Sequence, residues 1–288
     1  MHTVDLHVHS DYSDGTDSPE QLVTLAIEKG LQAFALTDHD TVEGIPALMA
    51  AAKKYPDAPE VIPGTELSVG FRDRDIHIVG LFIDSTHQEF LKMSNTMIER
   101  RKARNEEMAR RFQEAGIPVT IADLTAGNPD TVVTRAHFAR WLVSHGVVRS
   151  VPDAFRGYLN PEAPYYVPRT YISREEGIRI ILAAGGVPIL AHPLLYGLNE
   201  TELRKLLTEL KGYGLQGIEV KYSTYSHQDE YFVARLAREF DLLPSGGSDY
   251  HGKTKPDISL GTGRGKLAVP AEYLEALREQ AVKNRKNC

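Results

Sequence analysis

Short apolar runs alternate with longer segments of helical periodicity along most of the chain. Runs of two to eight residues bounded by turn residues predict strands. They lie at residues 4–8, 33–36, 61–62, 76–83, 187–190, 217–221 and 242–243. Apolar spacing of three and four predicts helices between most of them. The expected helices cover residues 18–30, 42–54, 173–185, 200–211, 228–240 and 271–284.

Helix start and stop signals support this alternation. Ser18 followed by Pro19 is typical of a helix start, and Gly30 suits its end. Ser173 with Glu176 has the spacing of a capping box. The pattern therefore predicts an α/β protein in which strands and helices follow one another.

Histidines and carboxylates recur where the predicted strands end. In the first strand, His7 and His9 alternate with apolar residues, so a period of two places both on one face. In a β/α barrel, the C-terminal ends of different strands converge on one mouth, which brings distant residues together. The candidate residues are His7, His9, Asp14, His39, Glu66, His77, His192, Asp249 and His251. We therefore expect a barrel with these side chains at its mouth.

These candidates have the chemistry of a polynuclear metal site. Imidazole and carboxylate together suit divalent transition metals, and nine ligands are too many for one ion of coordination number four to six. Asp38 and Asp40 fit better as partners that orient the imidazoles, or as helix-start residues. The ligand types admit manganese, iron or zinc, and magnesium at an oxygen-rich position.

The alternation breaks between residues 86 and 170. Helical patterns cover residues 89–114, 134–144 and 152–159, and residues 117–121 have a strand-like pattern. We interpret this interval as a mostly helical insertion near the barrel mouth. The basic residues of its first helix are interspersed with glutamates, which is typical of a solvated face, although a role in guiding phosphates stays open.

Composition indicates an ordinary globular chain. It has 288 residues, of which 42% are hydrophobic and 25% charged, and these values fit a large core. A net charge of -6 argues against a stable partnership with a large nucleic acid, although a local basic patch stays possible. The single cysteine, Cys288, and the lack of an apolar leader or spanning segment predict a cytoplasmic protein with no membrane association.

The ordered motifs resemble the polymerase and histidinol phosphatase (PHP) family of metallophosphoesterases. The resemblance rests on His7-x-His9, Asp14, Thr37-Asp38-His39, Gly64-x-Glu66, His77, Ala191-His192-Pro193 and Asp249-x-His251. It implies a distorted (β/α)7 TIM-like barrel formed by residues 1–85 and 171–288. Residues 86–170 would then form a substrate cap.

The same resemblance implies three metal ions. One would be held by His7, His9, Glu66 and Asp249, which would act in catalysis through a metal-bound hydroxide. Glu66 would bridge to a second ion, held with His77 and His192. The third would be held by Asp14, His39 and His251.

Three segments resemble one branch of the family, the nucleoside 3′,5′-bisphosphate phosphatases and 5′-3′ exoribonucleases. They are residues 5–15, 134–140 and 165–169. The resemblance implies removal of the 3′-phosphate from a nucleoside 3′,5′-bisphosphate. Alternatives are a 5′-3′ exonuclease on short 5′-phosphorylated oligonucleotides, a histidinol-phosphate phosphatase, and a non-catalytic metal-stabilised nucleic-acid-binding domain. The oligomeric state stays open.

Four residues in these segments are candidates for substrate binding. Arg135 and Arg169 could clamp a second phosphate, because guanidinium pairs bidentately with phosphate oxygens. Surface pairing with acidic residues is the alternative. His137 could donate to a phosphate or simply pack within a helix. Tyr166, or its neighbour Tyr165, could stack on a base, although an aromatic pair is also common in cores.

Overall fold

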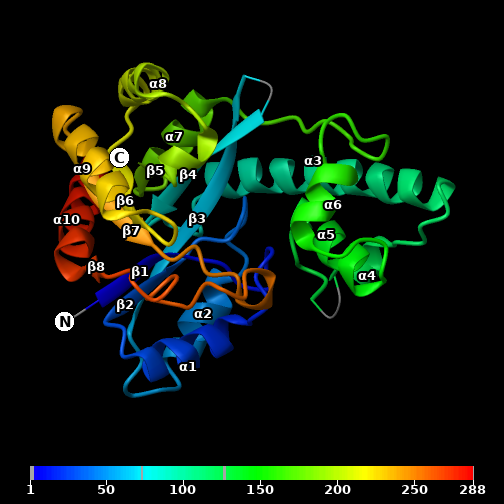
Figure 1. The fold of residues 1–288 in the computed structure, drawn as a ribbon. Coiled ribbons are helices and arrows are strands. Elements are labelled where there is room, and N and C mark those ends of the chain that lie inside the picture. Colours follow the sequence, from blue (N-terminus) through cyan, green and yellow to red (C-terminus); the bar gives the residue numbers. More distant parts are fainter. Residues whose placement is uncertain (1–2, 73, 126–127, 288) are drawn as a thin grey trace.

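The chain folds around an eight-stranded sheet that curls into a nearly closed barrel (Figure 1). The computed structural model describes residues 3–72, 74–125 and 128–287. Along the sheet the strand order is β7-β6-β5-β4-β3-β2-β1-β8. The strands are β1 (Thr3–Val8), β2 (Ala33–Leu36), β3 (Glu60–Phe71), β4 (Arg74–Leu81), β5 (Val187–Leu190), β6 (Gly217–Tyr222), β7 (Leu243–Gly247) and β8 (Val269–Pro270).

The distortion of the barrel lies at β4. Strands β1, β2 and β3 pair in parallel, as do β5, β6 and β7, whereas β4 is antiparallel to both β3 and β5. The barrel closes where the chain after β7 meets β1. There the Asp249 amide donates to the His7 carbonyl, and the His9 amide donates to the Tyr250 carbonyl, both at 2.9 Å. The expected distorted barrel is confirmed, with the two-residue β8 as an addition.

Helices flank the strands on several sides (Figure 1). They are α1 (Pro19–Lys29), α2 (Ile45–Ala52), α7 (Arg174–Ala183), α8 (Glu200–Tyr213), α9 (His227–Glu239) and α10 (Ala271–Asn287), with 3-10 turns η1 (Pro193–Tyr196) and η2 (Gly252–Thr254). One apolar cluster packs the sheet against α1, α2 and α7 to α9, and a second packs it against α10. No helix in the described residues is both long and apolar enough to cross a bilayer.

The capping predictions are confirmed. Ser18 caps α1 in a capping box with Gln21, and Gly30 ends that helix in the left-handed conformation, with φ of 65°. Ser173 and Glu176 form the capping box of α7. Local side-chain chemistry therefore sets where these helices begin and end.

Two boundaries differ from the expectation. Helix α2 begins at Ile45 rather than at residue 42, because Pro46 is tolerated only in a first turn. The strand expected at residues 117–121 is wrong. Instead, α4 (Ile121–Thr125) begins there, where the Thr120 and Asp123 side chains each accept a hydrogen bond from the other's backbone amide. This reciprocal cap outweighs the strand propensity of the apolar residues.

A group of helices extends to one side of the barrel (right in Figure 1). It comprises α3 (Gln88–Glu114), α4, α5 (Arg135–Ser144) and α6 (Val151–Gly157). Its own apolar cluster includes Phe112, Phe138 and Trp141. Phe90 and Met97, in the first half of α3, pack instead with the barrel core. The first half of α3 therefore packs on the barrel and its second half on the helical group, so the boundary between the two apolar clusters lies within α3 and not at its start.

Candidate metal centre

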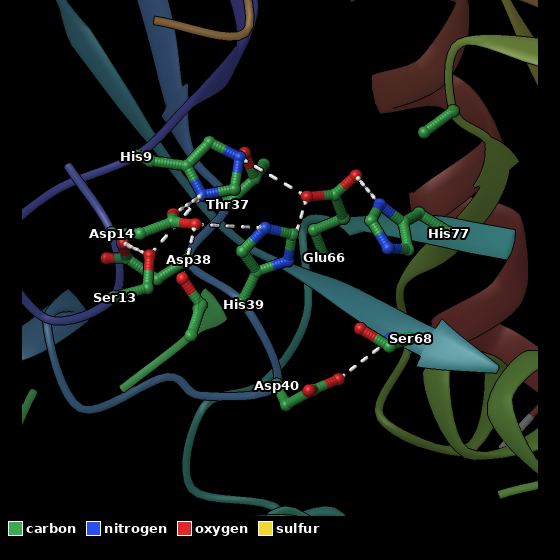
Figure 2. Close-up of polar contacts among 12 residues, drawn as sticks. His9, Ser13, Asp14, Thr37, Asp38, His39, Asp40, Glu66, Ser68 and His77 are labelled. Atoms are coloured by element: carbon green, nitrogen blue, oxygen red, sulfur yellow. Dashed lines mark hydrogen bonds and ion pairs between the residues drawn. The ribbon is translucent and has the colours of Figure 1, made fainter. Parts of the chain in front are cut away.

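All nine predicted ligands meet at one end of the barrel. His7, Glu66 and His77 project from β1, β3 and β4, and the others follow strand ends or lie in adjoining loops. Figure 2 shows His9, His39 and His77 around Glu66, with Asp14 beside His9 and His39. Most are buried, while the side chains of His39 and His77 are 12% and 22% exposed. The predicted ligands therefore form one connected cluster.

Glu66 lies at its centre. Its Oε1 lies 2.8 Å from His77, 3.0 Å from His192 and 3.4 Å from His7, and its Oε2 lies 3.1 Å from His39 and 3.3 Å from His9. Burial alone would raise the pKa of this carboxyl, but the surrounding histidines hold it well below its usual range. Glu66 is therefore ionised and contacts five imidazoles, the arrangement that a bridging ligand requires.

Two further carboxylates flank the cluster. Asp14 lies 3.1 Å from His251 and 3.7 Å from both His9 and His39. Asp249 Oδ1 lies 3.3 Å from His251 Nδ1 and 3.4 Å from His9 Nε2. The pKa of each carboxyl is lowered well below normal despite burial. Both carboxylates are therefore in the charged form that binds a cation.

The other oxygen of Asp249 is held by two donors. Lys255 Nζ and the Tyr222 hydroxyl each lie 2.6 Å from Oδ2. Asp249 itself has a positive φ of 56°. Such backbone is costly for a non-glycine residue and is common where a site fixes a side chain.

Three groups of side chains could each hold a cation. Within each group the ligand atoms lie within 4.8 Å of one another. The groups are His9, Asp14, His39 and His251; His7, His9 and Glu66; and His39, Glu66 and His77. His9, His39 and Glu66 each belong to two of these groups. His192 contacts Glu66, and Asp249 contacts His9, so both lie next to the groups.

The donor set fits divalent metals. Among the described residues, three buried atoms of the cluster lack a well-oriented hydrogen bond: Asp14 Oδ1, His39 Nδ1 and His192 Nδ1. Leaving such atoms unsatisfied is costly, and a cation would complete them. Mixed imidazole and carboxylate donors around shared carboxylates match transition metals.

Glu219 on β6 supports the cluster from behind and was missed by the sequence reasoning. Its Oε1 lies 3.1 Å from His7 Nδ1, and its Oε2 accepts a 2.7 Å hydrogen bond from the His192 amide. Its side chain is nearly fully buried. A lone carboxylate within the predicted strand at residues 217–221 was the available signal. Glu219 fixes the ring orientation of His7, as partners of metal-binding histidines commonly do.

Asp38 supports His9 through a serine, as Figure 2 shows. Its carboxylate accepts bonds from the Ser10 amide at 2.8 Å and from the Ser13 hydroxyl at 2.5 Å. Ser13 Oγ in turn lies 3.3 Å from His9 Nδ1. Asp40 points away from the cluster and binds Arg101, Arg169 and the Ser68 amide.

A cavity of about 140 Å³ opens beside His39 and His77. Four guanidiniums line it together with Asp14, Asp75 and Ser68. These are Arg101 and Arg104 of α3, Arg135 of α5, and Arg169. We call this cavity the arginine pocket. On the first insertion helix, Arg110 pairs with glutamates on the exposed face, as a solvated face predicts, whereas Arg101 and Arg104 are buried beside this cavity.

The other two predicted substrate residues lie outside the described lining of the arginine pocket. His137 is buried in the capping box of α5, where its Nδ1 accepts from the Thr134 amide at 3.0 Å. Burial, followed by the charge of Arg140, lowers the pKa of His137 to about 4. The ring of Tyr166 lies 6.0 Å from the Arg135 guanidinium.

Different aromatic residues line the arginine pocket. Phe155 and Tyr171 form part of its wall, and both face guanidiniums. Arg135 lies 5.7 Å from the Phe155 ring, and Arg169 lies 4.9 Å from the Tyr171 ring. Neither aromatic residue was singled out in the sequence, because only the fold brings residues 155 and 171 to one pocket. Tyr165 instead stacks on Phe112 at 4.4 Å, in the apolar core of the helical group.

Comparison with known proteins identifies the family. The PHP domain matches residues 5–159, more than half of the chain. The chain belongs to the PHP domain family. A 5′-3′ exoribonuclease from Haemophilus influenzae is 39% identical over 247 residues, which cover 86% of this chain and 89% of the relative. A 3′,5′-nucleoside bisphosphate phosphatase from Chromobacterium violaceum is 34% identical over 253 residues, covering 87% and 88%.

A solved structure supports the same assignment. A proposed metal-dependent phosphoesterase from Bifidobacterium adolescentis superposes with a TM-score of 0.85 at 28% identity, covering 97% of this chain and 96% of its own. This PHP protein is a metal-dependent phosphoesterase. The relatives match along nearly their whole length and are named hydrolases, which counts against a non-catalytic domain. Their names differ in substrate.

Proposed function

We propose that this PHP protein removes the 3′-phosphate of nucleoside 3′,5′-bisphosphates and holds the 5′-phosphate in the arginine pocket. One observation carries the proposal. The lining of the arginine pocket includes His39, His77 and Asp14 of the candidate metal centre as well as the four guanidiniums. A single small molecule could therefore place one phosphate at the metals and a second among the arginines.

Charge supports a second phosphate in the pocket. The four guanidiniums meet two carboxylates, Asp40 and Asp75, in ion pairs made by Arg101 and Arg169. Apart from Asp14, which faces the metal centre, the arginines exceed these carboxylates by two positive charges. This excess matches a phosphate monoester, which carries nearly two negative charges at neutral pH. We propose that Arg135 binds this phosphate directly, and that Arg169, held by Asp40 and Asp75, adds its charge at the wall of the pocket with Arg101 beside it.

The metal centre would supply the hydrolytic chemistry. We propose three divalent ions, manganese, iron or zinc, with magnesium as an option. They would be held by His7, His9, Glu66 and Asp249; by Glu66, His77 and His192; and by Asp14, His39 and His251. Such ions acidify water and stabilise charge on the entering and leaving oxygens of an in-line displacement. The proposal includes a cytoplasmic location, where nucleotides are formed and degraded.

The chain's own residues fix the geometry of this centre. Glu219 orients His7, and Ser13 with Asp38 orients His9. Lys255 and Tyr222 hold one oxygen of Asp249, so that the other faces the histidines. Preorganised ligands of this kind reduce the cost of reaching the transition state.

A 5′-3′ exonuclease activity on short 5′-phosphorylated oligonucleotides is the second candidate. The Haemophilus influenzae relative carries that name at 39% identity. Both reactions break the bond between the 3′-oxygen and phosphorus, and both would place the first 5′-phosphate in the arginine pocket. They differ in what leaves with the phosphorus atom, which is inorganic phosphate in one case and the shortened oligonucleotide in the other.

The test compares three substrates with the purified metal-loaded enzyme. We expect kcat/KM for adenosine 3′,5′-bisphosphate to exceed that for adenosine 3′-monophosphate by about ten- to a hundred-fold. This factor corresponds to the free energy of one or two charge-assisted hydrogen bonds to the 5′-phosphate. A 5′-phosphorylated trinucleotide measures the exonuclease. A chelator should abolish activity on every substrate. Equal turnover of the two mononucleotides would contradict the role of the arginine pocket.

A further inference from the structure

The four guanidiniums of the arginine pocket are not equivalent. Arg101 and Arg169 both bind Oδ2 of Asp40, and Arg169 also lies 3.7 Å from Asp75. Asp40 is fully buried and accepts a further 2.7 Å bond from the Ser68 amide. These two cations are therefore neutralised and fixed before any ligand arrives.

Arg104 is buried without a counter-charge. Its residue is 8% exposed, and it forms no ion pair with a carboxylate in the described part of the chain. Its protein acceptors are neutral: Nη1 donates to Asn105 Oδ1 at 2.7 Å and Nε to the Val167 carbonyl at 3.3 Å. Nη2 donates to no acceptor among the described residues. A desolvated charge in this state is costly, and an anion would relieve the cost.

The neighbourhood of Arg104 is positive. Burial, followed by the charges of Arg101, Arg135 and Arg169, lowers the pKa of Arg104 to about 9, so it stays protonated at neutral pH. The hydrogen bonds to Asn105 and to the Val167 carbonyl fix the direction of the Arg104 side chain. Asn105 is itself held, because its side-chain amide donates to the carbonyl of Val133, just before α5, at 2.8 Å.

Arg135 faces the same space from α5. It also forms no ion pair with a carboxylate among the described residues, and its contacts are the rings of Phe155 and Tyr166 and the Leu159 carbonyl. Thr134 and Ala136 line the pocket beside it, so the N-terminal end of the ten-residue α5 borders the cavity. A helix N-terminus favours an anion at that place.

We propose that Arg104 is a specificity-determining residue that, with Arg135, binds the 5′-phosphate of the substrate. This rests on the proposed function and deepens it. Arg101 and Arg169 position the pocket through Asp40, whereas Arg104 supplies the uncompensated charge that selects a phosphate dianion. The cavity of about 140 Å³ is large enough for a phosphate group.

The test uses Arg104→Gln, which removes the charge at similar length. For the bisphosphate we expect kcat/KM to fall ten- to a hundred-fold, and for adenosine 3′-monophosphate to stay within two-fold of wild type. Arg104→Lys should recover part of the loss, because it restores charge without the planar fork. Arg100→Gln is the matched control, since Arg100 lies on the same helix but is exposed, and it should leave both substrates unchanged.

Binding gives a second readout. Calorimetry with the metal-loaded enzyme should show weaker binding of adenosine 5′-monophosphate to Arg104→Gln by a similar factor, with adenosine unaffected. Thermal unfolding should show that the variant folds. If kcat/KM falls equally for both substrates, or the wild-type preference survives in Arg104→Gln, the role of Arg104 is refuted. If wild type itself shows no preference for the 5′-phosphate, the proposed function fails instead.

Discussion

Two buried glutamates show how position decides the role of a residue in this protein. Glu66 and Glu219 are both nearly fully buried on strands, and both contact His7. Glu66 lies among five imidazoles at the centre of the cluster. Glu219 contacts the opposite ring nitrogen of His7 and the His192 backbone. The first is placed to bind metal, and the second to orient ligands.

Replacing Glu219 with glutamine tests this division. Glu219→Gln should keep a carbonyl oxygen for the His192 amide but weaken the acceptor that holds His7. We expect metal affinity to fall about 10- to 100-fold, the range seen when outer partners of metal-binding histidines are lost. The measurement is metal retained against increasing chelator. Glu230→Gln, which alters a carboxylate paired with Lys221, should retain metal as wild type does. Unchanged retention in Glu219→Gln would show that Glu219 does not support the site.

At the residue scale, sequence reasoning identified the nine residues that the fold brings together, but not the residues that surround them. The ligands stand out because histidines and carboxylates interrupt apolar strands at their ends, a pattern visible without the fold. Arg104 resembled the other basic residues of a long helix, and only the packing of α3 against residues 133–167 buries it. The sequence of a helix rich in basic residues does not show which of their side chains become buried.

At the element scale, close approach of β1 and β7 shapes the site. Gly247 on β7 faces His7, and an added Cβ would lie only 2.4 Å from the His7 Cβ and 2.5 Å from its amide nitrogen. Two backbone hydrogen bonds between the ends of these strands close the barrel just beyond. A side chain at this position would push β7 away from the strand that carries His7 and leads to His9.

We therefore expect Gly247→Ala to harm both stability and activity. Overpacking a well-packed site typically costs about 1–3 kcal/mol, and here the displaced strand also carries a ligand. The matched control is Gly212→Ala in α8, where an added Cβ meets nothing within 4 Å. Its stability should rise by roughly 0.5–1 kcal/mol, because alanine favours a helix. Denaturant unfolding and metal content measure both effects. Equal stability of the two variants would contradict the close packing.

Element boundaries were predictable where a side chain sets them. Ser18, Gly30 and Ser173 fix helix ends through contacts local in sequence. The antiparallel β4 was not predictable, because its pairing with β3 and β5 depends on partners chosen by the fold. Alternation of apolar and polar residues predicts which side chains of a strand face the core. It does not predict whether the strand runs parallel or antiparallel to its neighbours.

At the scale of the whole molecule, the barrel and the helical group together line the arginine pocket. The barrel supplies the nine candidate ligands, and the helical group supplies Arg101, Arg104 and Arg135. Asp40 joins them, because it follows β2 and its side chain binds Arg101 of α3 while its carbonyl accepts from Ser94 of the same helix. The pocket therefore exists only when the helical group is docked on the barrel.

Metal binding should stabilise the whole fold, since the cluster is assembled only in the folded chain. An ion present at a hundred times its Kd adds about 2.7 kcal/mol, which raises the Tm by roughly 4–5 °C in a protein of this size. We expect this shift between chelated protein and protein with added manganese. His9→Ala should lose most of it, because His9 belongs to two of the three ligand groups. His145→Ala, at the exposed end of α5, should retain it. A full shift in His9→Ala would place the stabilising metal outside the cluster.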